Sequence, residues 1–360
     1  METARRRRKQ PVLPRSGPHP IKAPYDQLER AFMIIVTGGA GFIGSNLLAA
    51  LEARGDTDLV LCDDLGEGDK WCNVAKRELA DIVPPAELFD FLGDHRGDVE
   101  AVFHMGAQSD TMERDAELVI ELNTRYTMTL WEFCAADGIR FVYASSAATY
   151  GDGSAGFDDD GSVDALARLR PLNLYGWSKH LADRRIARLV ASGAPCPPQW
   201  AGLKFFNVYG PNEYHKGAMR SMAAQLYDQA AETGTVRLFR SYRDDIADGE
   251  QRRDFVSVDD CVAVMLWLDG HAEVSGLFNC GAGTASSFNA LAGHVFDALG
   301  VAPRIDYIDM PEAIRARYQY VTEAPMDRLR AAGYDRPPTP LAAGVESYVS
   351  GFLAAADRYR

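Results

Sequence analysis

The chain has 360 residues, of which 47% are hydrophobic and 25% charged, and its formal net charge at pH 7 is -13. That apolar fraction suits a globular fold and excludes a chain that is disordered throughout. The acidic balance argues against nucleic acid or a membrane surface as the main partner, and no uninterrupted apolar run reaches the ~18 residues of a transmembrane helix. The length favours two domains, or one core with an attached lobe.

Residues 1–32 differ from the rest of the chain in charge and composition. They hold eight Lys or Arg and three Asp or Glu, a net charge of +5, so the remaining residues carry -18. Four arginines at positions 5–8 are followed by five prolines and by no apolar segment. This composition predicts a disordered basic, proline-rich extension over residues 1–32 rather than a secretory signal, with folding beginning at Met33.

The six cysteines are scattered along the chain. No two of them form a CxxC pair, and no cluster of His and Cys has the spacing of a zinc site. We therefore predict no metal centre. Free cysteines inside apolar runs favour a reducing, cytoplasmic compartment.

The first two-thirds of the body alternate short apolar runs with amphipathic helical stretches. Strands are predicted at 33–36, 59–62, 101–104, 141–144 and 203–206, with helices over 45–53, 117–136 and 179–190. Apolar runs buried on both faces and separated by helices indicate βαβ units around a parallel sheet. The fold class is therefore α/β, a Rossmann-type doubly wound parallel sheet.

The remaining third predicts a smaller, discontinuous C-terminal substrate lobe. A helix is expected over 217–233, and strands at 255–258 and 277–280 are expected to return to the main sheet. Further helices are predicted over 288–299 and 341–355. The NAD(P)-binding Rossmann domain would then span 33–206 plus about 254–285, and the substrate lobe 207–253 plus about 286–360.

The most specific local pattern is the glycine-rich stretch TGGAGFIG at 37–44, between a predicted strand and a predicted helix. Glycines allow the tight turn and let backbone N–H groups approach a pyrophosphate at the helix N-terminus. This turn, with Gly38, Gly41, Phe42, Ile43 and Gly44, is predicted to hold a dinucleotide.

An acidic residue about 20 positions further on is expected to meet the ribose. Asp63 stands 19 residues after Gly44, and Asp64 follows it. A carboxylate there favours NAD, because it repels the 2′-phosphate of NADP. Lys70 can neutralise that phosphate if its loop folds back, so the residues themselves leave NADP and NAD both open.

Tyr175 and Lys179, four residues apart, share one face of a predicted helix. Tyrosine is a weak base at its ordinary pKa of about 10, and a neighbouring ammonium is expected to lower that pKa. Ser146 follows a predicted strand and can hydrogen-bond the same substrate oxygen. The three side chains together predict removal of a proton from an alcohol while hydride passes to a nicotinamide.

The segments TGGAGFIG, SSAATYG (145–151), YGWSK (175–179) and RRDFV (252–256) together resemble the extended short-chain dehydrogenase/reductase family, which acts mostly on nucleotide sugars. The resemblance covers residues 33–360. Dehydratases of this family carry an Asp-Glu pair directly after the catalytic hydroxyl residue. Ala147 and Ala148 stand at those positions, so the resemblance disfavours dehydration.

Within that family, NVYGPNEYHKGAM (207–219) and ARYQ (316–319) make the chain similar to the ADP-heptose 6-epimerases of lipopolysaccharide precursor synthesis. The resemblance implies inversion of C6 of ADP-D-glycero-D-manno-heptose through a transient 6-aldehyde, with NADP as the bound cofactor and NAD as the alternative. Two faces of the intermediate call for two acid/base groups, Tyr175 and Lys216. Ser146 would assist them, and Lys179 would tune Tyr175. The resemblance also implies a cytoplasmic homo-oligomer, a pentamer in this family.

The same resemblance assigns the remaining site residues. Besides the glycine turn and Asp63, Asp64 and Lys70, it implies cofactor contacts from Met105, Gly106, Ala107, Gln108, Ser109, Asn123, Tyr175, Lys179, Val208 and Lys216. Substrate contacts are implied for Ser146, Asn207, Phe239, Ser241, Arg253 and Tyr318. His104, at the end of a strand, is interpreted as a structural histidine.

Two alternatives remain open from the sequence. A UDP-hexose 4-epimerase or another sugar-nucleotide epimerase would turn its keto-sugar over in the site and would need no Lys216 base. A catalytically silent NAD(P)-binding sensor is the second alternative. Such proteins commonly lose the tyrosine or the lysine, and both are present here.

Overall fold

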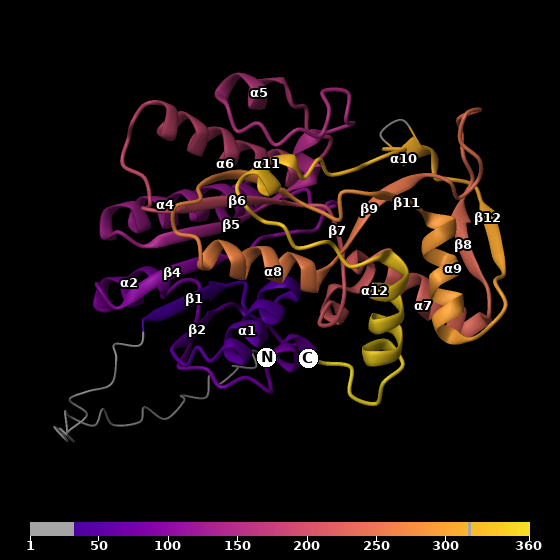
Figure 1. Cartoon of the computed structure of the whole chain (residues 1–360), viewed down its shortest axis with the longest axis horizontal. Coiled ribbons are helices and arrows are strands. Elements are labelled where there is room, and N and C mark those ends of the chain that lie inside the picture. Colours follow the sequence, from indigo (N-terminus) through magenta and orange to yellow (C-terminus); the bar gives the residue numbers. More distant parts are fainter. Residues whose placement is uncertain (1–31, 316–317) are drawn as a thin grey trace, which may run out of the picture. The chain divides into compact units, whose positions relative to one another are not determined.

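The computed structural model describes residues 32–315 and 318–360. Of the basic extension expected over 1–32, all but Phe32 lies outside the described residues, as do Ala316 and Arg317 of the ARYQ motif. Its centre is a seven-stranded sheet in the order β10-β6-β5-β4-β1-β2-β3 (Figure 1). The strands are β1 (Met33–Thr37), β2 (Leu59–Cys62), β3 (Asp81–Val83), β4 (Val99–His104), β5 (Arg140–Ser146), β6 (Trp200–Phe205) and β10 (Gly276–Cys280). All neighbouring strands pair in parallel, so the predicted doubly wound α/β fold is confirmed.

The order of the sheet reverses between β1 and β4, which is where ligands bind in folds of this class. Helix α1 (Phe42–Arg54) follows β1 directly, α4 (Tyr126–Asp137) precedes β5, and α6 (Leu174–Ala191) precedes β6. Helix α8 (Val258–Asp269) packs against α1. Parallel strands covered on both faces are almost entirely apolar, and β1 and β2 are buried at every residue.

The predicted strand at 255–258 does not return to the main sheet. It is part of β9 (Arg252–Ser257), which pairs in parallel with β7 (Asn207–Tyr209) and antiparallel with β11 (Ala285–Ser287). The physical reason is that β10 already occupies the free edge of β6, whose other edge holds β5. The strand predicted at 277–280 does return to the main sheet, as β10.

A second hydrophobic cluster lies apart from the core of the main sheet and is built mostly from the C-terminal half of the chain. It unites α7 (Met222–Thr233), α9 (Phe288–Leu299) and α12 (Leu341–Tyr348) with the parallel pair β8 (Val236–Phe239) and β12 (Ile305–Ile308). This arrangement supports the division into a Rossmann domain and a substrate lobe, which we keep as a proposal. Between residues 32 and 360, leaving out 316–317, no helix is long and apolar enough to cross a membrane.

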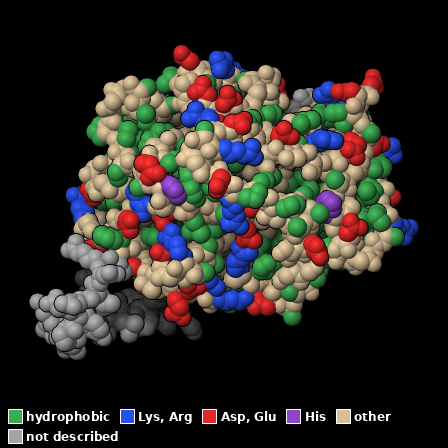
Figure 2. Space-filling model, viewed as in Figure 1, with side chains coloured by type: hydrophobic (Ala, Val, Ile, Leu, Met, Phe, Trp, Pro, Cys, Tyr) green, Lys and Arg blue, Asp and Glu red, His purple; other side chains and the backbone are tan. Residues whose placement is uncertain are grey.

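The remaining elements are short. They are η1 (Asp69–Asn73), α2 (Leu88–Asp94), α3 (Ala116–Ile120), η2 (Glu121–Arg125), η3 (Ala147–Tyr150), α5 (Val163–Arg168), η4 (Tyr214–Met219), α10 (Glu312–Arg315), α11 (Asp327–Ala331) and η5 (Val349–Leu353). On the face shown in Figure 2, acidic and basic side chains are interspersed. The acidic net charge therefore does not gather into a field of one sign on that face.

Candidate active site

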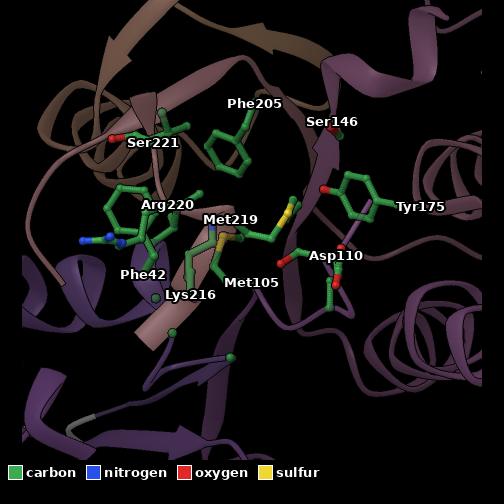
Figure 3. Close-up of a pocket in the computed structure, with 18 of the residues that line it drawn as sticks. Phe42, Met105, Asp110, Ser146, Tyr175, Phe205, Lys216, Met219, Arg220 and Ser221 are labelled. Atoms are coloured by element: carbon green, nitrogen blue, oxygen red, sulfur yellow. The ribbon is translucent and has the colours of Figure 1, made fainter. Parts of the chain in front are cut away.

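A cavity of about 630 Å³ opens at the carboxyl ends of β1, β4 and β5, and its size suits a small-molecule ligand. Figure 3 shows Ser146 and Tyr175 on one side of it and Phe42 and Lys216 on the other. Most of the residues predicted for the site line it, namely Gly38, Gly41, Phe42, Ile43, Gly44, Asp63, Lys70, Met105, Gly106, Ala107, Gln108, Ser109, Ser146, Tyr175, Lys179, Asn207, Val208 and Lys216. The fold thus brings together residues spread over almost 180 positions of the sequence.

The glycine turn has the form that a pyrophosphate requires. Gly41 is the N-cap of α1 and no side chain caps the helix, so N–H groups at the N-terminus of α1 remain available to an anion. Gly38 has a positive φ of 64°. A Cβ atom on Gly44 would overlap the carbonyl oxygen of Gly38 and lie 2.9 Å from the Cα atom of Gly39, so only glycine lets the helix approach the turn this closely.

Asp63 directly follows β2, and both oxygens of its carboxylate have partners within the protein. Its Oδ2 accepts a hydrogen bond from the Ala40 amide at 3.0 Å, and its Oδ1 pairs with the Lys70 ammonium at 2.6 Å. Lys70 also donates to the Asp64 carbonyl at 2.9 Å, whereas the Asp64 side chain is exposed and does not line the cavity. The loop that carries Lys70 therefore folds back onto Asp63.

Asn123 supports the cofactor side of the cavity without lining it. Its amide oxygen accepts from the Gln108 amide at 2.8 Å, and its Nδ2 donates to the Gln108 carbonyl at 2.9 Å and to Ser178 Oγ at 3.0 Å. His104 lies buried between the hydroxyls of Thr37 and Thr127, at 2.6 and 2.9 Å, and burial lowers its pKa to about 3. The prediction of a structural histidine is confirmed.

Tyr175 and Lys179 lie on α6, whose N-terminus is capped by Asn173, with the Gly176 amide donating to the Asn173 side chain at 2.8 Å. Burial raises the pKa of Tyr175, and hydrogen bonding with Ser146 offsets part of that rise. The expectation that Lys179 lowers this pKa is therefore wrong for this structure, because desolvation of the phenolate outweighs the other effects.

Lys179 itself is buried, and its Nζ atom has no hydrogen-bond partner among the described residues. Burial lowers the pKa of this lysine to about 8, against an opposing effect of Asp183. A buried ammonium without a partner is costly to a protein. Because Lys179 lines the same cavity as the glycine turn, its ammonium fits the ribose hydroxyls of a nicotinamide nucleotide.

Behind Ser146 and Lys179 lies a buried polar network that the sequence did not predict. Lys204 on β6 donates to Asp183 at 2.8 Å and to Thr149 at 2.6 Å, and both side chains of the ion pair are fully buried. Asp183 also accepts from Tyr143 at 3.1 Å and from Ser145 at 2.7 Å. The network fixes α6, which carries Tyr175 and Lys179, against β5 and β6.

Lys216 lies in η4, where Gly217 adopts a positive φ of 53°. Its Nζ atom is 5.5 Å from the centre of the Phe42 ring. Burial lowers the pKa of Lys216, while Glu213 opposes the effect. Neighbouring His215 also lines the cavity, and burial together with Lys70 and Lys216 lowers its pKa to about 4.

Arg220 and Asp110 line the same cavity and were missed. Arg220 Nε donates to the Gly217 carbonyl at 3.0 Å, and its guanidinium pairs with Asp228 at 2.6 Å. The available signal was the position of Arg220 directly before Ser221, the N-cap of α7, because a helix N-terminus at a cavity often meets an anionic ligand. Nothing in the sequence marked Asp110.

Four of the residues predicted to bind substrate do not line this cavity. Arg253, Tyr318 and Phe239 form a cluster of their own. The Arg253 guanidinium lies 5.0 Å from the Tyr318 ring, whose centre is 6.4 Å from that of Phe239. Ser241 follows β8 and its amide donates to Asp248 at 2.7 Å. Burial lowers the pKa of Arg253, and its Nη1 donates to the Arg252 carbonyl at 2.8 Å.

No metal centre competes with this interpretation. In the part of the chain that the structure describes, no group of three or more His, Cys, Asp or Glu side chains is arranged to hold an ion. The cavity instead offers a glycine turn at a helix N-terminus, a Tyr–Ser–Lys set and a second lysine. Such a site can bind a dinucleotide and move protons to and from a substrate oxygen.

Comparisons with known proteins agree with this geometry. The model of the NAD dependent epimerase/dehydratase family matches residues 34–281. The ADP-L-glycero-D-manno-heptose-6-epimerase of Nitratidesulfovibrio vulgaris (strain DP4) is 50% identical over 332 residues, 91% of this chain and 100% of the relative. The enzyme of that name from Fusobacterium nucleatum is 44% identical over 335 residues, again 91% and 100%.

A solved structure of the Helicobacter pylori ADP-L-glycero-D-manno-heptose-6-epimerase superposes with a TM-score of 0.74 at 25% identity, covering 92% of this chain and 100% of that one. The prediction of an isomerase that acts on a sugar nucleotide with a nicotinamide cofactor is confirmed by these relatives. The chain therefore belongs to the NAD dependent epimerase/dehydratase family, among the ADP-L-glycero-D-manno-heptose-6-epimerases.

Proposed function

We propose that this chain converts ADP-D-glycero-D-manno-heptose to its L-glycero epimer by oxidation and re-reduction at C6, with NADP held in the cavity. The observation that carries the proposal is the presence of two acid/base candidates, Tyr175 and Lys216, on different elements around one cavity. The names of the relatives supply the substrate.

Inversion at C6 requires proton transfer on both faces of the 6-aldehyde. Tyr175, assisted by Ser146, removes or returns the hydroxyl proton on one face, and Lys216 does so on the other. A bound nicotinamide would supply the hydride acceptor and donor for C6. Lys179 holds the cofactor ribose, whose hydroxyls would give its buried ammonium hydrogen-bond partners.

One observation supports NADP as the preferred cofactor. The Lys70 ammonium neutralises Asp63 at 2.6 Å, so the carboxylate no longer presents a free negative charge to a 2′-phosphate. Replacing Lys70 with alanine should weaken NADP binding more than NAD binding, because it exposes the charge of Asp63. Fluorescence titration of both nucleotides measures this, and an equal loss for both would contradict the preference.

We place the sugar at Asn207 and Ser146 in the cavity, and the ADP part at the cluster of Arg253, Tyr318, Phe239 and Ser241. A buried guanidinium next to an aromatic ring suits a diphosphate joined to a base. This placement requires the ligand to extend from the cavity toward the cluster. Arg253→Lys should then raise KM strongly while changing kcat little, because a lysine cannot make the bidentate contact.

The proposal also covers assembly and location. Leu118 on α3, Leu122 on η2 and Trp177 on α6 are exposed apolar residues, and α3 packs against α6. Such a surface supports a homo-oligomer. All six cysteines are free thiols, which supports a reducing, cytoplasmic location.

The decisive experiment is incubation with ADP-D-glycero-D-manno-heptose followed by NMR of the C6 centre. Formation of the L-glycero epimer is expected. Lys216→Ala should lower the rate by about 10²–10⁴-fold, as expected for loss of a general acid/base. Arg125→Ala, which removes an exposed cation paired with Glu121, is the matched control and should leave the rate unchanged. Full epimerase activity in Lys216→Ala would instead favour a mechanism with one base, as in a 4-epimerase.

A further inference from the structure

The last residues of the chain lie against the loop that carries Lys216. Tyr214, two residues before Lys216, donates its hydroxyl to the Arg358 carbonyl at 2.7 Å. The Arg358 guanidinium lies 3.8 Å from the centre of the Tyr214 ring, and the Tyr359 ring meets the same ring edge-on at 5.4 Å. The Arg360 amide donates to Asn212 Oδ1 at 3.0 Å. Residues 357–360, hereafter the C-terminal segment, therefore contact the loop at two positions.

The other side of the C-terminal segment is fixed to the nucleotide-binding part of the fold. The Lys76 ammonium donates to the Tyr359 carbonyl at 2.6 Å and pairs with Asp357 at 2.7 Å. The Arg360 guanidinium pairs with Asp259 at the start of α8. In Figure 1 the chain runs from α12 back to end beside α1. The segment thus bridges the loop and the sheet layer.

The backbone of the loop is conformationally restricted at Asn212, where the loop contacts the C-terminal segment. Asn212 is the one non-glycine residue with a positive φ, 71°, in the described part of the chain. Its side chain is fully buried and donates to Ser45 Oγ at 3.0 Å and to the Asn73 carbonyl at 3.2 Å. Asn73 in turn donates to the Ala40 carbonyl at 2.8 Å. The loop is therefore joined to the glycine turn on one side and to the C-terminal segment on the other.

We propose that the C-terminal segment positions Lys216 for catalysis, by fixing Tyr214 and Asn212 relative to the sheet. The inference rests on the proposed role of Lys216 as an acid/base. Lys216 lies in a short helical turn broken at Gly217, which by itself does not determine where the ammonium points. A misplacement of about 1 Å can cost about 10²-fold in rate, so contacts that fix the turn act directly on kcat. The segment does not touch the cavity, and it acts only through the loop.

Two variants test the contact from either side, namely Tyr214→Phe, which removes one hydroxyl from the loop, and Tyr359→Ala, which removes one ring from the segment. Each should lower kcat by about 5–10-fold, because one contact is lost while the others remain. KM and the affinity for NADP should stay within about twofold, since no binding residue is changed. Arg125→Ala, which removes an exposed cation that pairs with Glu121, serves as control.

The same variants are then made in a Lys216→Ala background, where positioning of the lysine no longer matters. The proposal expects their effect on kcat to fall below about twofold there. The same 5–10-fold loss in both backgrounds, or no loss in the parent enzyme, would overturn the positioning role alone. Full activity of Lys216→Ala by itself would overturn the proposed two-base function, and the positioning role with it.

Discussion

Lys179 gives the sharpest quantitative test, because its ammonium is buried without a hydrogen-bond partner in the described structure. We predict that Lys179→Met makes the cofactor-free protein more stable and at the same time abolishes its activity. Methionine has a similar length and fills the same space, so the apolar contacts of the side chain are kept. The buried charge, which only the active enzyme needs, is removed.

The magnitude follows from the pKa of Lys179, which burial lowers from 10.5 to about 8. Each pKa unit corresponds to about 1.4 kcal/mol, so the buried charge lowers the free energy of unfolding by about 3 kcal/mol at pH 7. Because the pKa is lower in the folded state, this cost is complete below about pH 8 and disappears as the pH rises toward about 10.5. The advantage of the variant should therefore shrink to about 1 kcal/mol near pH ~9.5.

Urea denaturation of enzyme stripped of nicotinamide, at both pH values, measures the difference. Arg125→Met, which changes an exposed cation in the same way, should show neither the gain nor its pH dependence. Saturating NADP should stabilise the parent more than the variant, because the ribose hydroxyls give Lys179 its missing partners. A variant no more stable than the parent at pH 7, or a stability advantage that does not decline with pH, would contradict this prediction.

Three further predictions concern the site and its support. Tyr175→Phe should keep the fold and the affinity for NADP while lowering kcat by about 10²–10⁴-fold; unchanged turnover in the NMR assay would disprove its role. Gly44→Ala should lower the free energy of unfolding by about 1–3 kcal/mol and weaken NADP binding, since its Cβ would overlap backbone atoms of the glycine turn; calorimetric titration with normal affinity would contradict this. Lys204→Met should lower the free energy of unfolding in urea denaturation by about 3–5 kcal/mol, because Asp183 stays buried without its cation. A loss below about 1 kcal/mol would show that the ion pair is not needed for stability.

The parts of the site formed by neighbouring residues were the easiest to predict. The glycine turn follows β1 and opens α1 because the pattern is complete within about ten residues. Tyr175 and Lys179 share a face because one helix carries both. Both predictions depend on local geometry, which is determined by residues that are close together in the sequence.

Strand pairings and side-chain contacts between residues that are distant in the sequence could not be predicted in the same way. The apolar run at 255–258 is equally suited to either sheet, and only the occupied edge of β6 excludes it from the larger one. Lys204 falls within the strand predicted at 203–206, but its partners at 149 and 183 come from distant elements and could not be read from the sequence. Arg253 and Tyr318 were predicted to bind substrate, and the structure places them against each other outside the cavity.

The discontinuity of the second hydrophobic cluster has a consequence for synthesis on the ribosome. Residues up to Cys280 complete the parallel sheet and the glycine turn, whereas the cluster needs α12, which emerges some sixty residues later. Domains tend to fold N-terminal part first as they emerge. Nascent chains should therefore gain the capacity to bind a dinucleotide before the Lys216 loop is fixed, so dinucleotide binding should precede epimerase activity during synthesis.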